Sequence, residues 1–204
     1  VLGLERKLMR SLLFPTVEEA DIAFHLALMN SGWNPSTLAN IDAESPYLVT
    51  PHPKDQGKLV LTSEGFFESQ DEEEEATLQA SKARARGNMQ FCTGLVKHTA
   101  SPPFIVAAYI KRVTPLREML KRQYVEAVKE LEDMRNRQAD AKIIEAQYLK
   151  TQELRQGCFN VWLYVNRKGD IKWLHTDSWN RYKPSGYTKL VSYLTLALDR
   201  LNTR

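Results

Sequence analysis

Cysteine is scarce in this chain, because Cys92 and Cys158 are the only two among 204 residues. Two cysteines cannot form a disulfide framework, and no pattern around them is typical of a zinc site. Small domains held together by several disulfides or by a structural zinc ion are therefore excluded. We expect two reduced, buried thiols. Long apolar runs are also missing, since none reaches the roughly 18 residues that a membrane-spanning helix needs.

The start of the chain lacks both a signal peptide and an initiator methionine, and Arg204 ends a segment with a helical pattern. We therefore expect an excised piece of a longer protein in a reducing cytoplasm. The net charge of +3 is only mildly basic and permits a nucleic-acid partner without requiring one. With 43% hydrophobic residues, the chain can build one large domain or two small ones.

The charges that are present are unevenly distributed. Residues 64–75 carry seven acidic side chains and no basic one, which predicts a solvated loop. Lys82, Arg84 and Arg86 then recur two residues apart and are followed by Gly-Asn at 87–88. In an extended strand this spacing puts all three cations on one face. A row of cations beside a turn suits a phosphate backbone.

Helical patterns dominate the N-terminal part. A helix is predicted over 2–14, and a second helix starts with a capping box at Thr16 and Glu19 and ends before Gly32. Asn34-Pro35 then opens a short helix over 36–40.

Short strands are predicted over 47–50 and 58–62. The next segment is ambiguous, because residues 79–86 and 89–96 can form two strands, whereas residues 72–86 are also rich in helix formers. Local signals leave both alternatives open.

The C-terminal part predicts a short helix over 104–113 and a long helix that begins at Thr114-Pro115 and is ended by Gly157. The long helix has about 42 residues, or roughly 60 Å. Its apolar stripe, from Leu116 to Ile144, has partly coiled-coil spacing, and its polar middle over 135–142 suits a bend or a protrusion. The remaining predicted elements are a hairpin of strands 159–165 and 171–174 and a final amphipathic helix over 187–201.

Several segments resemble the catalytic domain of the tyrosine recombinases. Residues 24–28, 31–38 and 41–42 resemble its opening, where a helix ends in a Thr-Gly-x-Arg turn and a second short helix leads to an aspartate before the sheet. Residues 82–87 resemble the β-hairpin that carries the catalytic lysine of that family. Residues 101–117 are similar to a group of large integrases from bacterial mobile elements, which have a long insertion after this point.

This resemblance covers roughly residues 16–122 and implies DNA strand exchange. In the family, a tyrosine hydroxyl attacks a phosphodiester and forms a 3′-phosphotyrosyl link. Two arginines and a histidine stabilise the charged transition state, and a lysine protonates the leaving 5′ oxygen. Lys82 matches that lysine and is the candidate general acid. The resemblance implies no metal and no other cofactor.

The chain departs from the family pattern at two points. Asn34 stands at the position of the first arginine, where it can donate a hydrogen bond to a phosphate oxygen but brings no charge. None of the four histidines is followed by arginine at the third position, so the family's H-x-x-R motif and the tyrosine after it are absent. We therefore expect a DNA-binding fragment that ends before the nucleophile and does not cleave DNA alone.

The expected fold is α+β and mainly helical, with a helix pair, a small antiparallel three-stranded sheet with a basic hairpin, one long helix, a C-terminal β-hairpin and a final helix. Residues 1–122 would form the N-terminal half of a recombinase-like catalytic domain, and residues 115–204 an insertion with the long helix. The expected partners are double-stranded DNA and other recombinase protomers, without a membrane or a small-molecule substrate, at the nucleoid in a bacterial cytoplasm. The candidate site residues are Asn34 and Lys82 for catalysis and Arg84, Arg86, Lys97, Lys111 and Arg112 for DNA binding, with no metal ligand.

Two other functions stay open. A helical interaction module would pair with another copy or another protein through the stripe from Leu116 to Ile144, which would have to be exposed in the monomer. A DNA-binding protein that keeps the recombinase fold without its chemistry would account for Asn34.

Overall fold

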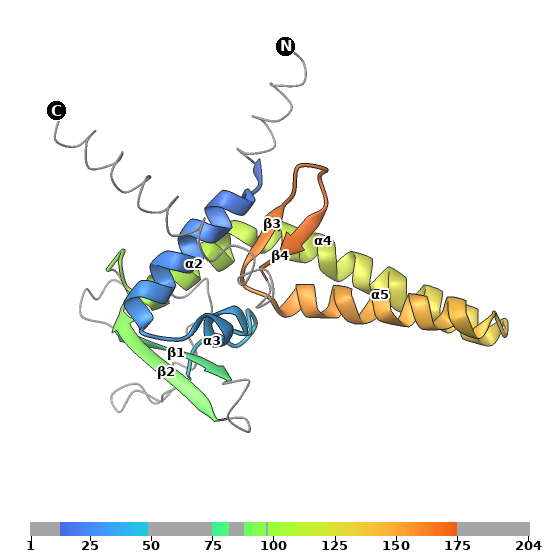
Figure 1. Ribbon diagram of the computed structural model, residues 1–204, viewed down its shortest axis with the longest axis horizontal. Coiled ribbons are helices and arrows are strands. Elements are labelled where there is room, and N and C mark those ends of the chain that lie inside the picture. Colours follow the sequence, from blue (N-terminus) through green and yellow to red (C-terminus); the bar gives the residue numbers. More distant parts are fainter. Residues whose placement is uncertain (1–12, 49–74, 82–87, 97, 175–204) are drawn as a thin grey trace, which may run out of the picture.

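The structure, a computed structural model, describes residues 13–48, 75–81, 88–96 and 98–174. Within these ranges the fold is α+β and mainly helical, as predicted, with four helices and two small antiparallel sheets. The elements are α2 (Val17–Ser31), α3 (Pro35–Ala39), β1 (Glu75–Ser81), β2 (Met89–Leu95), α4 (Pro102–Asn136), α5 (Ala141–Phe159), β3 (Leu163–Val165) and β4 (Ile171–Trp173). Figure 1 shows α2, α3 and the β1–β2 sheet gathered around the first part of α4, while the rest of α4 and α5 project from this body as a helical hairpin. In the described ranges, no helix is both long and apolar enough to cross a membrane.

Helix α2 begins and ends where its capping signals predict. Thr16 Oγ1 accepts a hydrogen bond from the Glu19 backbone N–H at 3.3 Å, and the Glu19 carboxylate accepts one from the Thr16 N–H at 2.8 Å. The predicted capping box is therefore confirmed, and both N–H groups are satisfied. Gly32 caps the other end at a φ of 66°, a left-handed conformation that glycine adopts without steric cost.

Residues 75–81 and 89–95 form strands, so the helical alternative for this segment is wrong. Strands β1 and β2 pair antiparallel, with Glu75 opposite Leu95 and Ser81 opposite Met89. On β1, Ala76, Leu78 and Ala80 are buried and alternate with more exposed side chains. Burial with a period of two thus outweighs the helix propensity of these residues.

A third chain segment runs along β1. The Leu48 N–H donates to the Thr77 carbonyl at 2.8 Å, and the Gln79 N–H donates to the Pro46 carbonyl at 2.9 Å, which makes an isolated bridge at Tyr47. This bridge falls in the strand that we predicted over 47–50. The other predicted strand, over 58–62, lies outside the described residues, as does most of the acidic run over 64–75.

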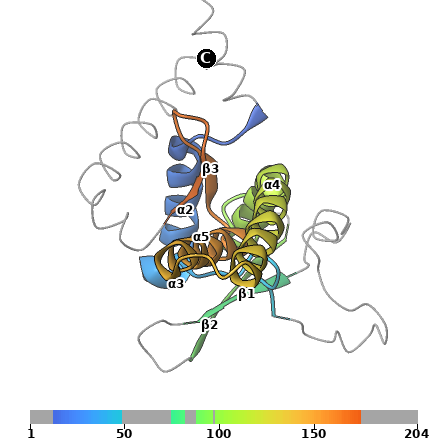
Figure 2. The same cartoon turned by 90° about the vertical axis from the view of Figure 1, so that its right-hand side faces the viewer.

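The prediction of one long helix from Pro115 to residue 156 is wrong. Helix α4 starts at Pro102 and passes through Pro115, and a turn over 137–140 leads into α5, which returns along α4 (Figure 2). Proline removes the N–H that would bond to the Lys111 carbonyl, but both residues are exposed, so water can satisfy that carbonyl. The polar stretch over 135–142, where we expected a bend or a protrusion, contains this turn.

The hairpin turn has weak sequence signals. Gln138 adopts a φ of 55°, which is uncommon for a residue with a side chain. Asp140 then caps α5, because its Oδ1 accepts a hydrogen bond from the Lys142 N–H at 2.8 Å.

Part of the apolar stripe from Leu116 to Ile144 is buried within the chain. Leu116, Leu120 and Leu131 are buried. Between the two helices, the buried Gln147 of α5 donates to the Ala127 carbonyl of α4 at 3.1 Å and to the Glu130 carboxylate at 2.9 Å. The helical interaction module needed this stripe exposed in the monomer, whereas these three leucines are buried and Val128, Met134 and Ile144 are half-buried.

Strands β3 and β4 form the predicted C-terminal hairpin. The prediction that Gly157 ends the preceding helix is wrong, because α5 continues to Phe159. A Cβ at Gly157 would come within 2.6 Å of the Trp173 ring, so glycine permits α5 to approach β4 closely. The predicted final helix over 187–201 lies outside the described residues.

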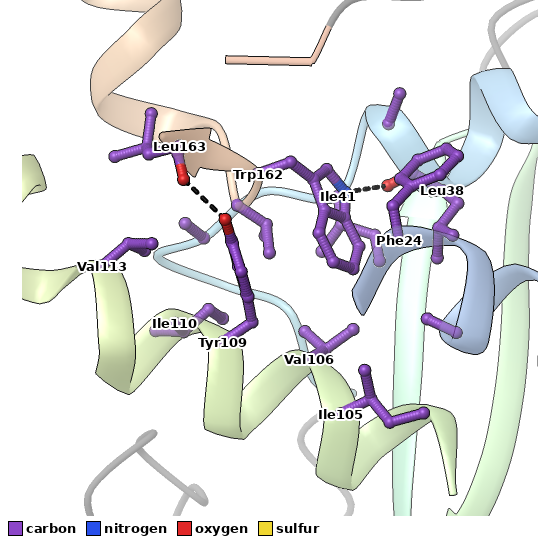
Figure 3. Packing of buried hydrophobic residues seen from close by; sticks show 14 of the residues in the cluster. Phe24, Leu38, Ile41, Ile105, Val106, Tyr109, Ile110, Val113, Trp162 and Leu163 are labelled. Atoms are coloured by element: carbon purple, nitrogen blue, oxygen red, sulfur yellow. Dashed lines mark hydrogen bonds between the residues drawn. The ribbon is translucent and has the colours of Figure 1, made fainter. Parts of the chain in front are cut away.

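Trp162 occupies the centre of the hydrophobic core, where it lies between α2, α3 and α4 (Figure 3). Its ring is fully buried and meets the Phe24 ring edge-on, with 5.2 Å between the centroids. Its Nε1–H donates to the Leu38 carbonyl at 2.9 Å, and the nearby Tyr109 hydroxyl donates to the Leu163 carbonyl at 2.7 Å. Both cysteines are free thiols, as predicted; Cys158 is buried and Cys92 is half-buried.

Candidate nucleic-acid-binding site

Asn34 is held in one orientation by the start of α3. Its Oδ1 accepts hydrogen bonds from the Thr37 backbone N–H at 2.9 Å, from Ser36 Oγ at 2.6 Å and from Thr37 Oγ1 at 3.0 Å. Asn34 is thus the N-cap of α3, a position for which asparagine is among the best residues. An arginine, whose side chain has no acceptor, could not supply this cap.

The same hydrogen bonds leave the Asn34 amide nitrogen as a donor. Fixing Oδ1 on the N-terminus of α3 turns Nδ2 away from it, since the two atoms lie on different sides of the amide carbon. The side chain is exposed, while the neighbouring Trp33 and Leu38 are buried and hold the turn against the core. A neutral donor on a well-held turn can bind one phosphate oxygen, but it cannot neutralise charge.

Four of the predicted cations lie outside the described residues. They are Lys82, Arg84, Arg86 and Lys97. The strands that precede and follow the first three are described, and Ser81 pairs with Met89. Residues 82–88 therefore connect two paired antiparallel strands, and the three cations belong to that connection.

Lys111 and Arg112 lie on α4, and the structure does not bring Arg112 to Asn34. Arg112 donates to the Leu13 carbonyl at 3.0 Å and forms an ion pair with Glu19 at 3.5 Å, both near the N-terminal end of α2. Asn34 follows the other end of this helix, and the two ends are separated by about 21 Å at 1.5 Å per residue. Arg112 could thus contact only a ligand that extends along α2, and Lys111, its exposed neighbour on α4, adds a second cation there.

The outer face of β2 is apolar, which the sequence analysis missed. Met89, Phe91 and Leu95 alternate along the strand with 44%, 53% and 39% of their surfaces exposed. Met89 lies at the end of β2 that follows the connection over 82–88, and Leu95 lies at the opposite end of the strand. The alternation Met-x-Phe-x-Thr-x-Leu was visible in the sequence, but it does not reveal which face of a strand is covered.

Arg117 is the other residue that sequence reasoning passed over. It is buried on α4, where its Nε donates to the Cys158 carbonyl at 3.2 Å and its Nη2 donates to the Asn160 carbonyl at 3.0 Å. Burial lowers the pKa of this guanidinium, opposed by Glu44 and other nearby groups. A signal was available, since Arg117 lies four residues after Val113 and beside Leu116, on the apolar face of the helix.

Four further titratable groups of the described part, two tyrosines and two cysteines, lie in buried or half-buried positions. The hydroxyls of Tyr47 and Tyr109 donate to the Pro103 and Leu163 carbonyls, and burial raises the pKa of both phenols. Burial also raises the pKa of the Cys92 and Cys158 thiols, which favours their protonated, unreactive form. The described ranges contain no group of three or more His, Cys, Asp or Glu side chains that could hold a metal ion.

Comparison of the chain with protein-family models, with curated proteins and with solved structures yields no match.

Proposed function

We propose that this chain is the DNA-binding part of a site-specific integrase of the tyrosine recombinase type. The observation that carries the proposal is the order of elements around the candidate residues. A helix ends at Gly32, the turn at Asn34 starts a second short helix, and a pair of antiparallel strands follows whose connection contains Lys82, Arg84 and Arg86. The resemblance of the sequence to that family implies this order.

In this proposal the three cations contact the phosphate backbone. Such contacts supply affinity without reading sequence, so duplex DNA of any sequence should bind. Asn34 Nδ2 would donate one neutral hydrogen bond, and Lys82 would be the general acid in the full-length protein. The protein would act with other recombinase protomers in the bacterial cytoplasm at the nucleoid. Cleavage would require an H-x-x-R motif followed by a tyrosine nucleophile, and this sequence does not contain that motif.

The geometry of Asn34 favours a variant of this proposal, in which the protein binds DNA without cleaving it. The amide oxygen is already committed to three hydrogen bonds at the N-terminus of α3. The position therefore has a structural role that does not depend on phosphate chemistry. A recombinase that had lost catalysis could keep the fold in this way.

The test is binding of a fluorescently labelled 30-base-pair duplex, followed by anisotropy, for the chain and for its K82A/R84A/R86A variant. We expect the triple variant to lose about 3 to 5 kcal/mol of binding free energy, or roughly two to four decades in Kd. The matched control is K129A/R135A/K142A, which removes the same charge from exposed positions on the α4–α5 hairpin. Equal losses in both variants would mean that net charge alone governs binding, and the connection between β1 and β2 would not be the DNA-binding edge.

A further inference from the structure

A buried cation of α4 holds the C-terminal end of α5, at the root of the α4–α5 hairpin, where the hairpin joins the rest of the fold. Arg117 has only 6% of its surface exposed, and its two hydrogen bonds go to the carbonyls of Cys158 and Asn160, at the C-terminal end of α5. Helix C-termini leave carbonyls without intrahelical donors and carry partial negative charge, so a guanidinium there both caps and neutralises the end of α5. In the described ranges, no carboxylate oxygen lies within 4.0 Å of this guanidinium.

The segment that Arg117 holds also contacts the segment after α3. The Ala43 N–H donates to the Phe159 carbonyl at 2.8 Å, and Asp42 and Asn160 form an isolated antiparallel bridge. Two residues further on, the Trp162 Nε1–H donates to the Leu38 carbonyl inside α3 (Figure 3). The end of α5 and the chain from Leu38 to Ala43 therefore form one hydrogen-bonded unit.

Helix α3 depends on this unit for its position. It has only five residues, and a helix this short is not stable without tertiary contacts. Its N-terminus is the Asn34 turn, whose carbonyl accepts hydrogen bonds from the Thr37 and Leu38 N–H groups. The end of α3 that carries Asn34 is thus one helical turn away from the Leu38 carbonyl bonded to Trp162.

We propose that Arg117 is a positioning residue that couples the projecting α4–α5 hairpin to the Asn34 turn. Arg117 holds the end of α5 through its two hydrogen bonds, and the end of α5 holds α3 through the bonds to Leu38 and Ala43. The position of α3 in turn sets the position of Asn34, its N-cap. A partner or protomer that moves the hairpin at its root would thereby displace Asn34. The assignment of a phosphate ligand to Asn34 rests on the proposed function, whereas the mechanical coupling does not.

Hydrogen exchange read by mass spectrometry tests the coupling without DNA. In Arg117→Met, which substitutes for the aliphatic stem of the side chain but removes both hydrogen bonds, exchange over residues 34–43 should accelerate at least about tenfold, since each bond from a charged donor is worth a tenfold change or more. Exchange over α2 should stay unchanged. Arg117→Lys should restore part of the protection, and Arg122→Met, on the exposed side of the same helix, should behave like the unmodified chain.

Two results would overturn the proposal. Faster exchange confined to residues 157–163 would mean that Arg117 caps α5 without reaching α3. A parallel increase in every segment would mean that Arg117 contributes only to global stability. Should Arg117→Met fail to fold, Trp162→Phe removes the hydrogen bond to Leu38 together with part of the buried ring and leaves Arg117 in place. Unchanged exchange over residues 37–40 in that variant would contradict the coupling.

A second readout separates this proposal from the proposed function. Arg117 is buried and cannot reach a phosphate, so Arg117→Met should weaken DNA binding without changing its dependence on salt. A chain that binds no DNA but shows the expected exchange pattern would refute the proposed function and leave the coupling intact. A smaller salt dependence in Arg117→Met would instead make Arg117 a phosphate contact and contradict its positioning role.

Discussion

Removing a single oxygen from the core should measurably destabilise the protein. In Tyr109→Phe the hydroxyl that donates to the Leu163 carbonyl at 2.7 Å is lost, while the ring stays in place beside Trp162. The Trp162 carbonyl points toward the β4 side of the hairpin, where it accepts a hydrogen bond from the Leu174 N–H. Because successive carbonyls along a strand point in opposite directions, the Leu163 carbonyl faces away from β4. It is then left buried without its donor.

The expected cost follows from that orphaned carbonyl. A buried acceptor that loses its partner costs about 1 to 3 kcal/mol, and we expect about 2 kcal/mol for Tyr109→Phe. For a chain of this size such a loss lowers the Tm by roughly 4 to 8 °C. The matched control is Tyr124→Phe on the same helix, whose hydroxyl makes no hydrogen bond with a described residue, so its Tm should stay within about 1 to 2 °C.

Thermal and urea unfolding followed by circular dichroism measure both variants. Equal stability of Tyr109→Phe and Tyr124→Phe would refute this prediction, because the Leu163 carbonyl would then have found another donor or water.

Three further predictions follow from the same structure. Because burial raises the pKa of Tyr47 and Tyr109, both phenols stay protonated to higher pH in the folded state than in the unfolded chain. Their contribution to the free energy of unfolding should be fully present below the unfolded pKa of about 10. Above that pH it should fall by up to about 1.4 kcal/mol per pH unit for each tyrosine. Urea unfolding at pH 9 to 11.5 checks this, and the decline should flatten in Y47F/Y109F; an equally steep decline there would contradict it. Gly32→Ala should cost about 1 kcal/mol and Gly32→Asn less, since nothing crowds the position and only the left-handed φ matters; equal stability of the two variants would contradict this. Asn34→Asp should keep the α3 cap and the Tm but weaken DNA binding, whereas Asn34→Ala should weaken binding and also lose about 1 kcal/mol of stability. Unchanged DNA binding in Asn34→Asp would mean that Asn34 Nδ2 does not contact DNA.

Local signals predicted both ends of α2, because each end is set by residues within one turn of the helix. The capping box at Thr16 and Glu19 and the left-handed Gly32 bound α2, and both act within one helical turn. The Asn34-Pro35 pair likewise predicted the start of a short helix, and Asn34 is the N-cap of α3. The three hydrogen bonds that fix its amide oxygen become visible only in the structure.

Elements whose position depends on distant contacts were predicted less well. Thr114-Pro115 is a typical helix start, yet α4 continues through it because Val113 and Leu116 on either side are buried in the core and the proline faces solvent. The turn at Gln138 has neither glycine nor proline, and only the packing of α5 along α4 requires it. For the same reason the role of Arg117 depends on Cys158 and Asn160, which follow it by about 40 residues in sequence.

The dependence of DNA affinity on salt tests the central claim most directly. We would measure Kd for a duplex between 50 and 200 mM salt for the chain and for K82A/R84A/R86A. Each phosphate contact contributes about 0.9 to the slope of log Kd against log salt, so the triple variant should have a slope smaller by about 2.7, with no such change in K129A/R135A/K142A. A chain that does not bind DNA at 50 mM salt, or a triple variant with an unchanged slope, would contradict the integrase proposal.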